Sequence, residues 1–274
     1  MSKKLIFLII VLFIIIIITI ILLYRKPSLE RNWENDQKIL AEISFSGSGV
    51  EIKNMRDFEY SSENEYIEKY YDKKINIDDL QSLDYIIEPF SDFDGPAHTM
   101  FSFGLKNGEY IVISAEIRKE KWESFSPIKW IMREYEMVYM IGSETDFVKL
   151  RANYRKDEVI LYPINTPKEK IQKLFISMLE RADELNNKPE FYNTLTQNCT
   201  TSILGHVNDL REEKIPWSFE ALLPSHSDKV IYDLWLIDTE LSLEEARKYY
   251  QINELSEQFW EAENYSEKIR KVIK

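Results

Sequence analysis

The sequence predicts an α+β fold, in which an antiparallel sheet packs on helices, with an N-terminal transmembrane helix in front of it. Three observations predict this fold. Residues 5–24 carry no charge and are almost wholly apolar. Residues 97–103 and 109–117 alternate between apolar and polar side chains around a turn, which is typical of a β-hairpin. Apolar residues then recur at helical spacing over 171–185.

The apolar run at 5–24 has the length of a membrane-spanning helix. At a rise of about 1.5 Å per residue, such a run covers about 30 Å, the thickness of the hydrocarbon core of a bilayer. Its end, Leu22-Leu23-Tyr24-Arg25, offers no small residues for a signal peptidase. We therefore expect an uncleaved signal anchor, single-pass in the cell membrane, with the bulk of the chain extracytoplasmic.

The sequence pattern divides the chain into three parts. We expect residues 1–26 to be the anchor, residues 27–240 an extracytoplasmic α+β domain, and residues 241–274 a C-terminal helical extension. The extension begins at a capping box, Ser242-Leu243-Glu244-Glu245, and a charged helical tail follows it.

Burial predicts the register of the hairpin. A three-residue loop with Gly108 in a left-handed conformation places apolar residues opposite each other on one face: Phe101 opposite Ile113, and Phe103 opposite Ile111. The same register places His98 opposite Glu116 on the other face, with their Cβ atoms about 5 Å apart. We therefore expect His98 and Glu116 to be in contact.

Hydrophobic periodicity and helix-capping residues predict further strands and helices. Strands are expected around 50–52, 135–140 and 159–162. A capping box at Thr166, with Pro167 at the first helical position, opens the helix that continues to residue 185. A later amphipathic helix carries Cys199 in its first turn, and its apolar face is formed by Ile203, Leu204, Val207 and Leu210.

Composition excludes several classes of function. The chain has 35 Lys and Arg against 47 Asp and Glu, a formal charge of −12, so its surface repels the phosphates of nucleic acids. It has only 7 Gly, and no glycine-rich phosphate-binding loop or zinc-ligand spacing occurs. We expect no nucleic-acid partner, no cofactor and no metal.

Cys199 is the only cysteine in the chain. Exported proteins use most of their cysteines in disulfides, so a single one is either a small buried side chain or a working thiol. A helix N-terminus lowers the pKa of a thiol, and a nearby imidazole lowers it further and accepts its proton. Cys199 as nucleophile, His98 as base and Glu116 as the group that orients His98 have the types that such a triad needs. His98 is also compatible with a purely structural role in its strand.

Several blocks of the sequence, in this order and spacing, resemble the Lnb N-terminal periplasmic domain family. The histidine block is Ala97-His98-Thr99-Met100-Phe101-Ser102-Phe103-Gly104, and Ser114-Ala115-Glu116-Ile117-Arg118 follows it. Tyr135-Glu136 and Glu144-Thr145-Asp146 match the next segment, and Phe191-Tyr192-Asn193 with Asn198-Cys199-Thr200-Thr201 matches the cysteine block. The resemblance extends from about Trp33 to Ile237.

The resemblance implies a fold and an activity. The family is similar to circularly permuted NlpC-like, papain-type thiol enzymes, in which the histidine strand precedes the cysteine helix. It implies Cys199 as nucleophile, His98 as base and Glu116 as orienting group. Asn198 and the backbone N–H of Cys199 are our own candidates for the oxyanion. Five more residues fall in matching blocks: Arg118, Glu144, Asp146, Arg151 and Tyr192. We favour a polar lattice of salt bridges and hydrogen bonds around the site for them, with Tyr192 and Arg118 as candidate substrate-binding residues.

Three hypotheses about function follow. The first is a membrane-anchored, cysteine-dependent acyltransferase or acyl hydrolase, in which lipids or lipoproteins are substrates and the chemistry serves bacterial lipoprotein N-acylation. Because the family's namesake has a multi-spanning membrane portion, this hypothesis includes a separate multi-spanning membrane partner protein. The second is an NlpC-type peptidoglycan amidopeptidase. The third is a non-catalytic subunit of a membrane complex.

Overall fold

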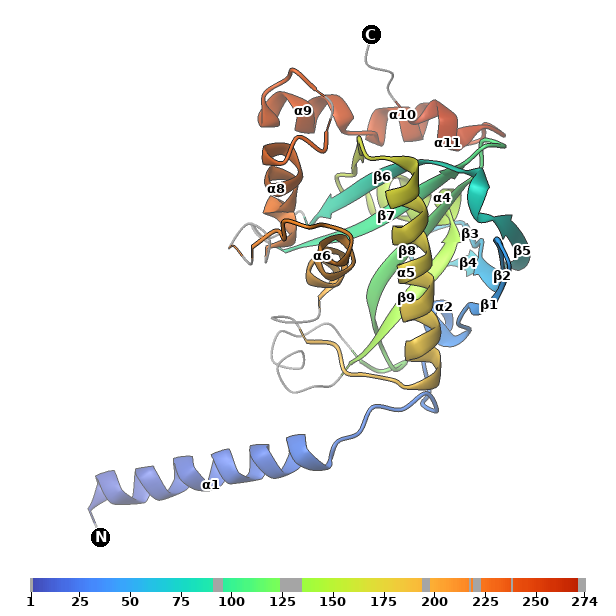
Figure 1. Ribbon diagram of the computed structural model, residues 1–274. Helices are drawn as coiled ribbons and strands as arrows, with labels where there is room; N and C mark the ends of the chain where they lie inside the picture. Colours follow the sequence, from blue (N-terminus) through green and yellow to red (C-terminus); the bar gives the residue numbers. More distant parts are fainter. Residues whose placement is uncertain are drawn as a thin grey trace.

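A large β-sheet with helices on both faces organises this protein (Figure 1). The computed structural model describes residues 2–90, 96–123, 135–193, 198–216, 218, 223–237 and 239–270. In these ranges eight strands form the main sheet: β1 (Glu42–Ser46), β2 (Gly49–Arg56), β5 (Tyr70–Asn76), β6 (Leu80–Pro89), β7 (Ala97–Leu105), β8 (Tyr110–Arg118), β9 (Glu136–Ser143) and β10 (Ile160–Pro163). The order across the sheet is β1-β2-β9-β8-β7-β6-β10, and β5 also pairs with β2. Two short strands, β3 (Glu59–Tyr60) and β4 (Tyr66–Ile67), pair with each other.

The sheet is mixed, so the prediction of an antiparallel sheet is wrong in this respect. Strand β2 lies parallel to β9, with Arg56 opposite Gly142. A Cβ at Gly142 would lie 2.3 Å from the carbonyl oxygen of Arg56, so only glycine allows the two backbones to approach this closely. This pairing could not be predicted from local sequence patterns, because it joins segments more than eighty residues apart.

The prediction of an N-terminal transmembrane helix is also wrong. Residues Lys3–Tyr24 form helix α1, which projects away from the sheet in Figure 1. Among the residues that the structure describes, no helix combines the length and the apolar character required to cross a membrane.

The predicted hairpin is confirmed in its register. Phe101 pairs with Ile113 and Phe103 with Ile111 across β7 and β8. The loop contains Gly108 with φ 83°, which is the left-handed conformation that the register requires. Its apolar face lies in the larger of the two main cores, and residues such as Met100 and Val112 face the second core on the opposite side of the sheet.

Helices α5 (Lys168–Asn187) and α6 (Cys199–Asp209) cover the face of the larger core. The predicted helix at α5 is present, but its predicted start is not. Pro167 is the N-cap with ψ 143°, the helix begins at Lys168, and no side chain caps it. The capping box predicted at Thr166 is therefore wrong, because the proline stands one position before the helix rather than inside it.

The other helices flank the sheet or cover its second face. They are α2 (Asn35–Lys38), α4 (Glu144–Lys149), the π-helix η2 (Leu150–Arg155), α8 (Ser227–Asp233), α9 (Leu243–Tyr250), α10 (Asn253–Gln258) and α11 (Tyr265–Lys268), with 3₁₀ turns η1 (Ile77–Asp79) and η3 (Pro224–His226). The capping box predicted at Ser242 is confirmed and opens α9. The C-terminal residues form three short helices rather than one, and Ile252, Tyr265 and Ile269 contribute to the second core.

Candidate functional site

Cys199 is the first residue of α6, as its sequence context predicts. Asn198 is the N-cap: its side-chain oxygen accepts a hydrogen bond from the backbone N–H of Thr201, and the Thr201 hydroxyl accepts one from the backbone N–H of Asn198. The sulfur is thereby held in the first turn, where free backbone N–H groups favour an anion. The Cys199 side chain is buried, with only 5% of the residue exposed.

His98 and Glu116 come from adjacent strands, β7 and β8, and meet as the hairpin register predicts. Their closest atoms, His98 Nε2 and Glu116 Oε1, are 3.6 Å apart. Ser114 lies between them: its Oγ is 2.6 Å from His98 Nε2 and donates a 3.0 Å hydrogen bond to Glu116 Oε1. Because the Ser114 proton points at the carboxylate, Nε2 of His98 is the donor to Ser114. The ring nitrogen left for the thiol is then Nδ1.

The thiol of Cys199 and the ring of His98 shift each other's pKa in opposite directions. Burial alone raises the pKa of Cys199, but hydrogen bonding to His98 and the charge of that ring lower it to about 7. Burial alone lowers the pKa of His98, but its hydrogen bonds to Cys199 and Glu116 raise it to about 9. Since the imidazole is then the stronger base of the two, the pair favours a thiolate and an imidazolium at neutral pH.

Arg151, on η2, fixes the carboxylate behind His98. Its Nη2 donates to Glu116 Oε1 at 3.2 Å, and its Nε donates to Glu88 Oε2 at 2.6 Å. Burial raises the pKa of Glu116, but the His98 hydrogen bond and the charge of Arg151 outweigh it and keep the pKa far below its usual range. Glu116 is therefore ionised and held in place, as an orienting group must be.

Two threonines lie directly around the sulfur. Thr99 hydrogen-bonds the thiol through both its backbone and its hydroxyl, and both bonds lower the pKa of Cys199. The Thr99 hydroxyl also lies 3.1 Å from the hydroxyl of Thr200, the residue after the cysteine. Strand β7 thus supplies both the imidazole and donors to the anionic sulfur from adjacent residues.

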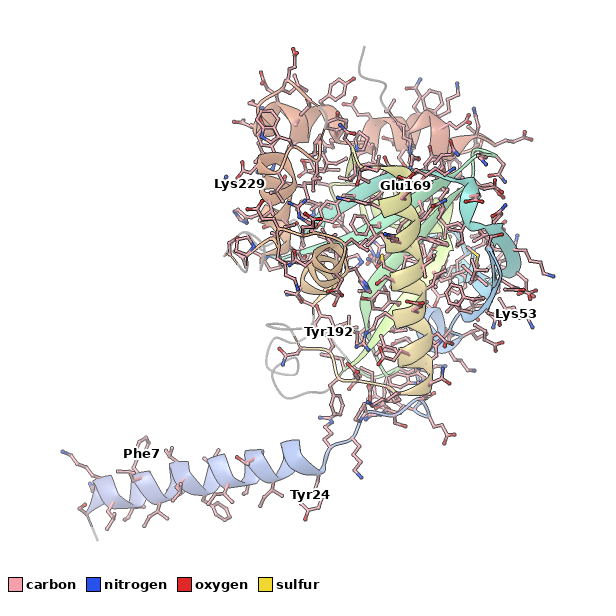
Figure 2. The ribbon with its side chains drawn as sticks, viewed as in Figure 1. Phe7, Tyr24, Lys53, Glu169, Tyr192 and Lys229 are labelled. Carbon is pink, nitrogen blue, oxygen red and sulfur yellow. The ribbon has the colours of Figure 1, made fainter. Side chains whose placement is uncertain are left out.

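Not all of the residues predicted to bind the oxyanion or the substrate lie beside the thiol. The Tyr192 hydroxyl, labelled in Figure 2 beneath α6, is hydrogen-bonded to the backbone of Cys199. The side-chain oxygen of Asn198 is occupied by the helix cap. Arg118 lies apart from the thiol: it donates to the carbonyls of Gln37 and Lys38 and stacks on Trp33 at 4.4 Å. Tyr192 is the member of this group that can act beside the backbone N–H of Cys199.

Four residues of the site were not predicted to be functional residues: Ser114, Thr99, Glu88 and Arg151. Ser114 and Thr99 had a signal in the sequence, because each stands within two residues of a predicted triad member on a strand. Arg151 falls in a block that matches the family and was expected in a polar lattice around the site, where its bonds to Glu88 and Glu116 place it. Glu88 had no signal, since no local pattern places it beside the hairpin. In the described part of the chain, no group of three or more His, Cys, Asp or Glu residues is placed to hold a metal ion.

The arrangement as a whole is that of an activated nucleophile. A thiolate at a helix N-terminus faces an imidazolium, and an ionised carboxylate with its own arginine stands behind the ring. Such a site attacks an electrophilic carbonyl carbon, and the imidazolium can protonate the group that leaves.

Comparison with known proteins identifies the family but no characterised relative. The family model described as the Lnb N-terminal periplasmic domain matches residues 66–225, more than half of the chain and including all three triad residues. No curated protein and no solved structure matches the chain significantly. The resemblance read from the sequence blocks is therefore confirmed, whereas the papain-type, NlpC-like arrangement that it implied stays a prediction.

Proposed function

Because the chain belongs to the Lnb N-terminal periplasmic domain family, we propose that it is an extracytoplasmic thiol enzyme that transfers or hydrolyses acyl groups through Cys199. The periplasmic description of the family indicates a location outside the cytoplasm. The observation that carries the proposal is geometric: Cys199 opens helix α6, and His98 is held by Ser114 and Glu116. The pairing with His98 lowers the pKa of Cys199 to about 7, and the pKa of His98 is raised to about 9. A merely structural cysteine in a buried position would instead have a raised pKa.

The first half of the reaction forms a thioester. The Cys199 thiolate attacks the carbonyl carbon of an ester, and the carbonyl oxygen becomes an oxyanion. The Tyr192 hydroxyl accepts from the Cys199 backbone N–H, and its own proton is available to the oxyanion. When the tetrahedral intermediate collapses, the C–O bond breaks. The proton on His98 Nδ1 passes to the departing alkoxide, which leaves as an alcohol.

The second half releases the acyl group. Neutral His98 now takes a proton from an incoming amine or water, which attacks the thioester carbonyl. The C–S bond breaks, and the thiolate is restored opposite a protonated imidazole. Ser114 and Glu116 keep the Nε2 side of the ring engaged through both halves, so Nδ1 stays directed at the sulfur.

We propose lipid or lipoprotein esters as acyl donors, in keeping with the lipoprotein acyl transfer that the family resemblance implies. Incubation of the full chain with a diacylated lipoprotein and, separately, with muropeptides tests this choice. We expect a thioester adduct on Cys199 and loss of ester from the lipoprotein, measured by mass spectrometry. Cleavage of muropeptides without any turnover of lipid would instead assign the site to a cell-wall amidopeptidase.

The activated thiol itself is tested by alkylation. Between pH 5 and 10, we expect the rate of iodoacetamide labelling of Cys199 to rise through about pH 7. In His98→Ala the midpoint should move above the ordinary thiol value of about 8.5, because burial then acts without a compensating cation. His206→Gln is the matched control, because His206 lies on the same helix and bonds Tyr139 and Ser177 instead of the thiol. Identical profiles for the wild type and His98→Ala would remove His98 from the site.

A further inference from the structure

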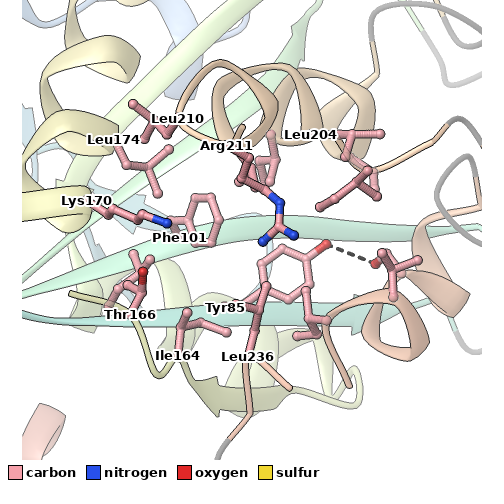
Figure 3. A pocket seen from close by; sticks show the side chains of 18 residues that line it. Tyr85, Phe101, Ile164, Thr166, Lys170, Leu174, Leu204, Leu210, Arg211 and Leu236 are labelled. Carbon is pink, nitrogen blue, oxygen red and sulfur yellow. Dashed lines mark hydrogen bonds between the residues drawn. The ribbon is translucent and has the colours of Figure 1, made fainter. Parts of the chain in front are cut away.

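An apolar pocket extends along the side of α6 that faces the sheet (Figure 3). Six residues of α6 and its C-terminal end line it at helical spacing: Thr200, Ile203, Leu204, Val207, Leu210 and Arg211. They cover the length of the helix, roughly 16 Å at 1.5 Å per residue. Strands β6 and β7 form the floor of the pocket with Tyr85 and Phe101, and α5 and α8 form its sides.

The two ends of the pocket differ in character. Thr200 and Tyr85 mark one end, next to the cysteine, and their hydroxyls are already bonded to Thr99 and Ser227. Lys170 of α5 and Arg211 mark the other, and Figure 3 shows both cationic groups directed over the apolar lining. The pocket is therefore apolar along its length and cationic at one mouth.

Neither cation at this mouth has a carboxylate partner among the residues that the structure describes. Arg211 donates through Nε to the backbone carbonyl of Glu213, which leaves its two Nη groups for another acceptor. Lys170 is exposed to solvent. In a chain of net charge −12, two cations without carboxylate partners beside an apolar pocket favour an anionic ligand. A planar guanidinium suits a carboxylate in particular, because it can bind both oxygens.

The conformation and exposure of Trp235, next to the pocket, favour an amphiphilic ligand. Trp235 follows α8 in the left-handed conformation, with φ 56°, a position where glycine is usual and a bulky residue is strained. Its side chain is 81% exposed, although its neighbour Leu236 lines the pocket. An indole held outward at the boundary between apolar lining and water is suited to contact an amphiphile at that boundary.

We propose that this pocket binds a free fatty acid, with the carboxylate between Lys170 and Arg211 and the alkyl chain along α6 toward Thr200. The apolar side chains that line the pocket along α6, such as Ile203, Leu204 and Val207, supply the surface for the alkyl chain. One end of this site adjoins the thiol, since the Thr200 hydroxyl lies 3.8 Å from Cys199 Sγ, whereas the carboxylate binds at the opposite end. This site does not rest on the proposed acyl chemistry.

Photoaffinity labelling of the full chain tests the proposal. A dodecanoic acid that carries a diazirine on its alkyl chain is added to Cys199→Ala protein, in which no thioester can form, and adducts are mapped by mass spectrometry. We expect adducts on peptides from α5, α6 and α8, and we expect laurate to suppress them. Adducts confined to the apolar helix α1 would overturn the proposal, as would the absence of any adduct.

Charge variants test the placement of the carboxylate. In Lys170→Gln/Arg211→Gln, laurate should compete roughly tenfold less well, because two charged partners are lost. Lys173→Gln/Lys214→Gln is the matched control: it removes one exposed lysine from α5 and one exposed lysine close after Arg211, and neither lines the pocket. Dodecyl maltoside, a neutral amphiphile, should compete poorly with the wild type. Equal competition by laurate and dodecyl maltoside, or equal behaviour of the two double variants, would overturn the proposal.

Val207→Phe provides a third measurement, because Val207 lines the pocket between its two ends and the substitution leaves both cations in the sequence. Labelling of α6 should fall while thermal unfolding reports that the variant is folded. If this folded variant were labelled as strongly as the parent, the alkyl chain would lie elsewhere.

Discussion

At the scale of single residues, Ser114 connects the imidazole to the carboxylate. Its hydroxyl is closer to His98 Nε2, at 2.6 Å, than the Glu116 oxygen is, at 3.6 Å. The charge of Glu116 therefore reaches the ring mainly through a hydroxyl that accepts from one side and donates to the other. A network of this kind fixes both the tautomer and the orientation of the ring.

We predict that Ser114→Ala slows alkylation of Cys199 at pH 7 by roughly tenfold, since hydrogen bonds to charged groups are worth about 1.5–3 kcal/mol and each 1.4 kcal/mol is a factor of ten. The rate is measured by labelling with iodoacetamide under pseudo-first-order conditions. Ser102→Ala is the control. Ser102, on β7, is buried like Ser114, and the substitution removes its hydrogen bond to the carboxylate of Glu144. An equal effect of both variants would mean that general destabilisation, not the Ser114 bridge, slows the thiol.

The sequence allowed part of the site to be predicted, for a physical reason. Alternation and a left-handed Gly108 determine which residues of a hairpin face each other, so His98 and Glu116 could be paired in advance. The position of Cys199 followed from the helical period after it. The pairing of Arg151 with Glu88 could not be predicted, because a buried ion pair between η2 and β6 leaves no periodic trace in either segment.

At the scale of elements, His206 ties the cysteine helix to the rest of the fold. Its Nε2 lies 2.8 Å from the hydroxyl of Tyr139 on β9, and its Nδ1 lies 2.7 Å from the hydroxyl of Ser177 on α5. The ring thus joins α6, α5 and β9 at a buried point. Burial lowers the pKa of His206 to about 4. The ring is accordingly neutral at neutral pH, donating through one nitrogen and accepting through the other.

The lowered pKa of His206 predicts that acid weakens the contact between α6, α5 and β9. The pKa of His206 is about 4 in the fold and near 6.5 when unfolded, so the unfolded chain binds more protons in this window. Stability is therefore present above pH 6.5 and is lost as the pH falls toward 4, by roughly 3 kcal/mol at most.

We expect His206→Gln to remove this acid-dependent loss of stability while it keeps the hydrogen bonds to Tyr139 and Ser177. Urea unfolding at pH values from 7 to 4 measures it as the difference between wild type and variant. The control is His226→Gln, since that ring lies on η3 and contacts the neighbouring Ser225. A difference between wild type and His206→Gln that stays constant with pH would contradict the assignment.

Some helices and strands were predicted correctly and others were not, and the wrong predictions have one physical cause. The hairpin, α6 and α9 follow from local period and caps, and all three are present. The parallel pairing of β2 with β9 depends on a contact between distant segments. The start of α5 depends on whether Pro167 lies inside or before the helix, which one residue of sequence pattern does not distinguish. Local chemistry thus predicts elements, and tertiary contacts decide their ends and their neighbours.

At the scale of the whole molecule, a half-buried cation, Arg270, helps to hold the C-terminal helices on the sheet. Arg270 bonds Asp84 on β6 through Nε and Nη2, and Glu144 on α4 through Nη1 and Nη2. Its guanidinium also lies over the ring of Tyr110, 3.3 Å from the centroid. The last residues that the structure describes are therefore bound to the opposite side of the sheet from α5 and α6. Helices α9 to α11 thus pack against the sheet, and the division of the chain at residue 240 stays a prediction.

Arg270→Met should destabilise the protein by about 3–5 kcal/mol at pH 8, because it leaves two buried carboxylates without their cation. The deficit should shrink as the pH falls. Burial raises the pKa of Asp84 to about 6 even with Arg270 present, and loss of that cation raises it further. A group with a raised folded pKa binds more protons when folded, so its variant gains stability relative to the wild type as the pH decreases through that pKa.

Chemical denaturation of the full chain at pH 8 and at pH 5.5 measures the change in this deficit. Lys268→Met is the matched control, since it removes an exposed cation from α11 without touching either carboxylate, and we expect little effect at either pH. A deficit that is the same at both pH values would mean that Arg270 acts by packing on Tyr110 rather than by neutralising Asp84 and Glu144. A deficit that is absent altogether would mean that the ion pairs of Arg270 contribute nothing to the free energy of unfolding.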